Sequence, residues 1–341
     1  MRRRKQVTIG LVALILVATA PPATAARPTP AYDASPFASI PSLATSRTDR
    51  LRPGAERRIA AIHWLRTTSA GATVLVSPAY AGDPSTGDRW AGFFASLVHG
   101  TELGLLTAYI ATPAEINTIC PDAIGCYSSN RLWVSDEPSG GISPQMVAAH
   151  EYGHHVANNR ANPPWIAVDS GAKRWATAMN VCSRTRSGTA YPGDEGAFYT
   201  LNPGEAFAET YRVLNGYGAD QWDVVDTSFW PTQVALDAAR ADVLNPWTEA
   251  ATQTLRIHVT HARAWTGRIS TPLDGSLAVT TTTGGVDLQL RSADGKNVLA
   301  RGSWGSSGGK SIGYQVCGER SFVLRVASAG PRRLKLRVTE P

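Results

Sequence analysis

Residues 150–154 of this chain are His150-Glu151-Tyr152-Gly153-His154. They lie within residues 143–159, where we expect a helix because Ser143 is a good N-cap and Pro144 suits the first helical position. Positions i and i+4 share one face of a helix, so His150 and His154 can place two imidazole nitrogens about one metal ion. Glu151 would flank the same site. This H-E-x-x-H pattern is typical of zinc hydrolases.

The motif supplies two metal ligands, whereas a catalytic zinc usually has three protein ligands and a water. His155 is expected to be a neighbour, because it points about 100° away from His154 on an ideal helix. The next histidine, His258, falls in a region of different character. A carboxylate is therefore the best candidate for the third ligand. Glu205 and Glu209 are one turn apart on an expected helix and both qualify.

Residues 150–154, together with the stretch Asn-Pro-Gly-Glu-Ala-Phe-Ala-Glu at 202–209, resemble the metallopeptidase domain of the anthrax-toxin lethal factor type, a zincin. The resemblance covers roughly residues 105–214. It implies that Glu205 is the third zinc ligand and that Glu209 orients a ligand histidine. It also implies a tyrosine that assists at the developing oxyanion. Tyr199 is the nearest match, one residue closer to the glutamate than in the family pattern.

The chain begins with a pattern typical of an exported protein. Residues 2–5 are basic, residues 7–20 are apolar, and Ala-Thr-Ala at 23–25 fits a cleavage site. We therefore expect a signal peptide at 1–25, followed by a Pro-rich linker or pro-segment at 26–55. No other long apolar run occurs, so we expect a secreted, extracellular protein without stable membrane insertion after signal removal.

The charge balance argues against a nucleic-acid partner. The chain has 33 basic and 27 acidic residues, a formal net charge of +6. Removing the four basic residues of the expected signal leaves 29 basic and 27 acidic residues, a net charge of +2. No basic tract with interleaved aromatic residues is present.

Four cysteines are present, Cys120, Cys126, Cys182 and Cys317. An even number in an exported protein suggests disulfides, and four cysteines allow three pairings. Cys120 and Cys126 are close in sequence, with a proline and a glycine between them to turn the chain. We favour that pair, which leaves Cys182 to pair with Cys317.

Other segments before residue 250 show helical or strand patterns. Helices are expected at 56–69, 90–98, 172–182, 203–212 and 234–244, strands at 73–76, 105–112 and 130–135, and a loop at 120–126. The strand at 130–135 is the last before the metal helix. It could form the floor or edge of a cleft, where an extended peptide could pair with it.

From Leu255 the hydrophobic period changes to two, with turns at Asp-Gly and Gly-Gly pairs. This pattern is typical of an antiparallel β-sandwich. The stretch 286–295, with Cys317-Gly318 later in the chain, resembles the C-terminal pre-peptidase-type β-sandwich of secreted bacterial peptidases. The expected fold class is α+β, with a zincin-like metallopeptidase domain at 56–250 followed by an all-β sandwich domain at 254–341.

These patterns favour a secreted zinc-dependent endopeptidase that acts on a protein or peptide substrate. Zn²⁺ would be held by His150, His154 and Glu205, with Glu151 as general base and Tyr199 at the oxyanion. Two alternatives remain open: a non-catalytic binding protein on a zincin scaffold, and a zinc hydrolase of a non-peptide amide. The sequence specifies neither the substrate nor the oligomeric state.

Overall fold

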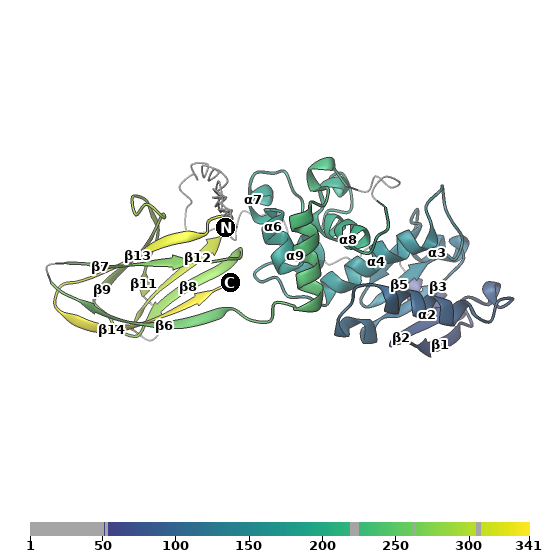
Figure 1. Cartoon of the computed structure of the whole chain (residues 1–341), viewed down its shortest axis with the longest axis horizontal. Coiled ribbons are helices and arrows are strands. Elements are labelled where there is room, and N and C mark those ends of the chain that lie inside the picture. Colours follow the sequence, from purple (N-terminus) through teal and green to yellow (C-terminus); the bar gives the residue numbers. More distant parts are fainter. Residues whose placement is uncertain (1–50, 52–53, 219–224, 262, 305–307) are drawn as a thin grey trace, which may run out of the picture. The chain divides into compact units, whose positions relative to one another are not determined.

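The computed structural model describes residues 51–341, except for 52–53, 219–224, 262 and 305–307 (Figure 1). The expected signal peptide and all but the last residues of the expected linker lie outside the described residues. The described part has a mixed α+β fold with three β-sheets. None of the described helices is long and apolar enough to cross a membrane.

The first sheet carries the strands nearest to the metal motif. Its strand order is β1-β2-β3-β5-β4. The strands are β1 (Leu65–Ser69), β2 (Ala72–Val76), β3 (Thr107–Ile110), β4 (Gly125–Ser128) and β5 (Arg131–Val134). Strands β2, β3 and β5 are mutually parallel, whereas β1 and β4 run antiparallel to their neighbours.

The strand expected at 130–135 exists as β5, but it is not at the edge of the sheet. Ser129 and Asn130 both have positive φ angles, which suits a tight hairpin turn, and they fold β4 back against β5. Strand β5 is therefore hydrogen-bonded on both sides, and β4 is the edge strand. Residues 120–126 are accordingly only partly a loop, because Gly125 and Cys126 belong to β4.

Two helices carry the motif residues, α4 (Pro144–Asn158) and α8 (Pro203–Leu214). Ser143 accepts a hydrogen bond from the Met146 amide at the start of α4, as expected of an N-cap. Asn202 plays the same part at the start of α8 by accepting from the Gly204 amide. Sequence analysis therefore placed the starts of both helices correctly.

The remaining helices of the first 250 residues correct some expectations. They are α1 (Ala55–Ala61), α2 (Thr86–Ser96), α3 (Pro113–Ile119), α5 (Ala167–Ser170), α6 (Lys173–Ala178), α7 (Val181–Arg186) and α9 (Gln233–Leu244). The helix expected at 56–69 ends early, and its second half is strand β1. The helix expected at 172–182 is broken, because Asn180 has a left-handed backbone conformation between α6 and α7. Helix α3 was not expected; Thr112 and Glu115 form a capping box at its start.

The described residues from 251 onward form two antiparallel sheets, as the period-two pattern predicts. Their strand orders are β10-β9-β13-β7 and β11-β12-β8-β14-β6. The strands are β6 (Ala251–Val259), β7 (Trp265–Ser270), β8 (Gly275–Thr281), β9 (Val286–Arg291), β10 (Val298–Arg301), β11 (Ser303–Trp304), β12 (Lys310–Val316), β13 (Ser321–Ser328) and β14 (Arg332–Glu340). The buried residues of one hydrophobic cluster all lie between 257 and 338, so this region has a core of its own.

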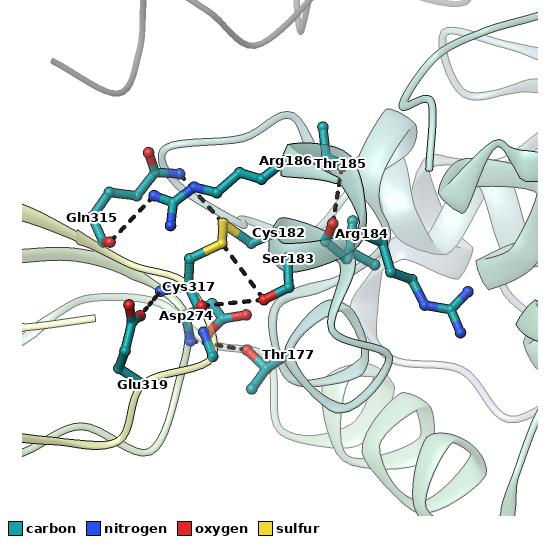
Figure 2. The surroundings of a disulfide bond; sticks show 12 residues. Thr177, Cys182, Ser183, Arg184, Thr185, Arg186, Asp274, Gln315, Cys317 and Glu319 are labelled. Atoms are coloured by element: carbon teal, nitrogen blue, oxygen red, sulfur yellow. Dashed lines mark hydrogen bonds between the residues drawn. A yellow bond between two sulfur atoms is a disulfide. The ribbon is translucent and has the colours of Figure 1, made fainter. Parts of the chain in front are cut away.

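The structure contains two disulfides, Cys120–Cys126 and Cys182–Cys317, in the pairing favoured from the sequence. Cys120 caps the end of α3 and Cys126 lies in β4, so the first disulfide ties the edge strand to a helix. Figure 2 shows the second, which joins α7 to the end of β12. Beside it, Ser183 donates a hydrogen bond to the Cys317 carbonyl. Two disulfides suggest that the protein matures in an oxidising environment.

Candidate metal centre

Three buried side chains meet at one point between α4 and α8. His150 Nε2 lies 3.2 Å from His154 Nε2 and 3.1 Å from Glu205 Oε2, and His154 Nε2 lies 3.5 Å from the same oxygen. All three residues are at most 1% exposed. Metal–ligand distances of about 2.0–2.1 Å give tetrahedral edges of about 3.3–3.4 Å. The three atoms therefore already have the spacing of a metal-binding triad, and they form a group that could hold a metal ion.

Helical spacing brings the two histidines together, and a close crossing of α4 and α8 brings Glu205 to them. His150 and His154 are one turn apart on α4, and their rings meet edge to face. A Cβ on Gly153 would lie only 2.7 Å from the Cα of Ala208. The glycine thus lets α8 approach α4 closely enough for Glu205 to reach the histidines.

Glu209 contacts the other side of His150. Its Oε1 lies 2.7 Å from His150 Nδ1. If Nδ1 carries the proton and donates it to Glu209, the Nε2 lone pair points toward His154 and Glu205. Burial raises the pKa of Glu209, but hydrogen bonds from His150 and Arg212 outweigh it and lower that pKa. Glu209 is therefore an ionised acceptor that orients the ring, in the position expected from the sequence.

Arg212 completes this chain of contacts, and sequence analysis did not identify it. Its Nη2 donates to Glu209 Oε2 at 2.6 Å and its Nε donates to Glu209 Oε1 at 3.0 Å. Nη1 donates to the Tyr217 and Gly218 carbonyls. The side chain is fully buried. Its spacing of three residues from Glu209 on α8 was the available sequence signal.

Glu151, on the next position of α4, lies against the edge strand. It is 3% exposed, and a Cβ on Gly125 would lie 3.3 Å from the Glu151 Cγ and 2.4 Å from Val147 Cγ1. Strand β4 can therefore approach this face of α4 because residue 125 has no side chain. The structure thus places Glu151 of the H-E-x-x-H motif beside Gly125 of β4, whose residues are all buried.

Tyr199 lies in a short 3₁₀ helix (Tyr199–Leu201) just before α8. Its hydroxyl donates a hydrogen bond to Glu205 Oε2 at 2.8 Å. The phenol therefore reaches the triad, although it is one residue closer to the glutamate than the family pattern has it. Its side chain is half-buried, so the hydroxyl is at the boundary between the triad and its surroundings.

His155 is not part of the triad, as expected. Its Nε2 donates to the Glu102 carbonyl at 2.8 Å, and its Nδ1 lies 3.3 Å from the Tyr127 hydroxyl. Burial lowers the pKa of His155, so this ring is a neutral core residue. His258 lies on an exposed face of β6, away from the group formed by α4 and α8.

The carboxylates of Glu205 and Glu209 favour protonation of His150. Burial lowers the pKa of His150, but hydrogen bonds to Glu205 and Glu209 outweigh it and raise the pKa to about 9. The two carboxylates that flank His150 thus favour its protonated form. A metal ion and this proton compete for the same nitrogen, since a metal ligand must be deprotonated.

No protein-family model matches this chain, and a search of curated proteins finds no match either. The geometry of the site is therefore the basis for assigning a function.

Proposed function

We propose that this protein is a zinc-dependent endopeptidase with a zincin-type metal centre, exported from the cell. One observation carries the proposal: buried donor atoms of His150, His154 and Glu205 lie 3.1–3.5 Å apart. Two imidazoles and one carboxylate form a donor set used by catalytic zinc sites, which keep a fourth position for water or substrate.

His150, His154 and Glu205 would hold the ion. When bound, zinc would supply Lewis-acid chemistry, lowering the pKa of a water and polarising a carbonyl. Glu209 and Arg212 would keep His150 in the tautomer that presents Nε2 to the ion.

Glu151 would act as general base and then as general acid. It would accept the proton of the attacking water and deliver it to the leaving amine. The Tyr199 hydroxyl would leave Glu205 and donate to the oxyanion that forms at the attacked carbonyl. That hydroxyl is already within hydrogen-bond distance of the triad, which supports this role.

Strand β4 supports a peptide substrate. Within the described part of the chain β4 pairs only with β5, and its four residues are buried. An extended peptide that reached the outer edge of β4 would pair with the strand that contains Gly125, which lies next to Glu151.

The proposal is tested with the mature protein, its Glu151→Gln variant and a Glu249→Gln control on an exposed residue. Metal content is measured by mass spectrometry, and cleavage is measured on a peptide library. We expect about one zinc per chain in all three proteins, with cleavage lost only in Glu151→Gln. A wild-type protein that binds no metal contradicts the metal centre. Zinc binding without cleavage of any peptide contradicts the endopeptidase activity.

A further inference from the structure

The outer face of two paired strands in the sandwich region carries a cluster of exposed cations. On β14, Arg333, Lys335 and Arg337 are exposed and alternate with the buried apolar residues of the same strand. On β6, which is the edge strand of that sheet, Arg256 and His258 are exposed in the same way. We call these five side chains the basic face.

The register places these side chains directly beside one another. Arg333 pairs with His258, and Lys335 pairs with Arg256. Lys335 and Arg256 place two like charges opposite each other, which destabilises a sheet, so this pair does not serve the fold. No ion pair involves the four Arg and Lys side chains among the described residues, and the exposed positions of β6, β14 and β8 include no carboxylate. The basic face thus has uncompensated positive charge.

The face is also hollowed. A depression of about 520 Å³ is lined by four of the five basic side chains, by two threonines and by two apolar residues: Arg256, His258, Arg333, Lys335, Thr282, Thr283, Ile257 and Leu334. Two further exposed threonines lie nearby: Thr254 is in β6, and Thr280 is in β8, the other neighbour of β14. Positive charge is therefore combined with hydroxyl groups in a shallow open hollow.

The distances between the basic side chains indicate what kind of ligand the basic face could bind. Alternate residues of a strand are about 6.7 Å apart, and opposed residues of two strands are about 5 Å apart. Arg333, Lys335 and Arg337 therefore form one row of cations along β14, with Arg256 of β6 beside Lys335. Such a row matches a linear polymer with anions at regular intervals. The strands β6, β8 and β14 contain no aromatic residue for stacking bases. Their outer face also presents no large apolar side chain that could anchor a lipid surface.

We propose that the basic face binds a linear acidic polysaccharide. Arg and Lys would pair with its sulfate or carboxylate groups, and the threonine hydroxyls would contact its sugar hydroxyls. This site is separate from the metal centre, so the proposal does not depend on the endopeptidase activity.

The test uses the full mature chain and fluorescein-labelled heparin, a sulfated polysaccharide, in a fluorescence anisotropy titration. The test variant is Arg333→Gln/Lys335→Gln/Arg337→Gln. The matched control, Arg268→Gln/Lys296→Gln/Arg301→Gln, removes three charges from exposed positions elsewhere in the sandwich region. At about 0.15 M ionic strength, we expect the test variant to bind heparin about tenfold or more weakly than wild type, with a flatter salt dependence. The control should bind like wild type.

Three results would overturn the proposal. One is equal loss of affinity in both triple variants, which would mean that net charge alone attracts heparin. Another is no heparin binding by the wild-type protein. The third is tighter binding to phosphatidylglycerol vesicles, oligo-dT or neutral dextran than to heparin, which would assign the face to another partner. Circular dichroism checks the folding of each variant. If the triple variant is unfolded, the single variant Lys335→Gln replaces it, and we expect a smaller loss of heparin affinity.

Discussion

Arg212 donates two hydrogen bonds to Glu209, at 2.6 and 3.0 Å, and both side chains are completely buried. Because Glu209 also contacts His150 Nδ1 at 2.7 Å, the guanidinium is linked to the metal triad through one carboxylate. The carbonyls of Tyr217 and Gly218 hold the other end of the guanidinium. Arg212 is thus a positioning residue for a histidine that it does not touch.

Arg212→Met should weaken metal binding about 10–100-fold, because Glu209 would no longer be held against His150. Metal affinity is measured by competition with a chelator of known zinc affinity. Arg160→Met is the matched control, since Arg160 also donates at 2.6 Å to a buried carboxylate, Glu102, which does not contact His150. Equal weakening by both variants would show a general effect of breaking a buried ion pair.

Gly153→Ala should disrupt the crossing of α4 and α8, because the added Cβ would lie 2.7 Å from the Ala208 Cα. We expect a loss of about 1–3 kcal/mol in the free energy of unfolding, together with weaker metal binding as Glu205 moves away. Denaturant titration measures the free energy of unfolding, and chelator competition measures the metal affinity. Gly92→Ala on α2 has no atom within 4 Å of its added Cβ and should be neutral or stabilising. Unchanged metal affinity in Gly153→Ala would contradict this account of the glycine.

The two disulfides should differ in their effect on stability. Cys182–Cys317 spans 135 residues and Cys120–Cys126 spans six, so the first restricts the unfolded chain more. We expect Cys182→Ala/Cys317→Ala to lower the free energy of unfolding by about 4–5 kcal/mol. The corresponding change at Cys120 and Cys126 should cost less. Denaturant titrations of the two double variants make the comparison, and the reverse order would contradict it.

The metal-free protein should lose stability as the pH rises from about 6.5 to 9. The pKa of His150 is raised to about 9 in the folded state from an ordinary value near 6.5. Its stabilising contribution is therefore fully present below pH 6.5 and lost as the pH passes through 9. Calorimetry of chelator-treated protein measures this trend, and His150→Gln should flatten it. Added zinc should stabilise the protein more at pH 8 than at pH 6, since the proton competes less strongly for His150 at the higher pH. An opposite trend would contradict metal binding at His150.

Local sequence features predicted much of the site. Ser143 and Asn202 fix the starts of two helices through side-chain caps, and the spacing of His150 and His154 then follows from the helical repeat. The period-two pattern after residue 255 predicted the antiparallel strands, because one face of each strand is buried. These features depend on neighbours within a few residues.

Long-range packing decided which carboxylate joins the two histidines and which strand lies at the edge of the first sheet. Helical spacing alone left both Glu205 and Glu209 as candidates, and only the family resemblance favoured Glu205. The crossing of α4 and α8 at Gly153 brings Glu205 to the histidine Nε2 atoms and Glu209 to Nδ1. The placement of β4 at the sheet edge depended on a turn at Ser129–Asn130 and on pairing with β5. The sequence by itself therefore determined which residue types could bind a metal and on which helices they lie. Only the tertiary structure decided which carboxylate joins them, because that choice depends on how two distant helices pack.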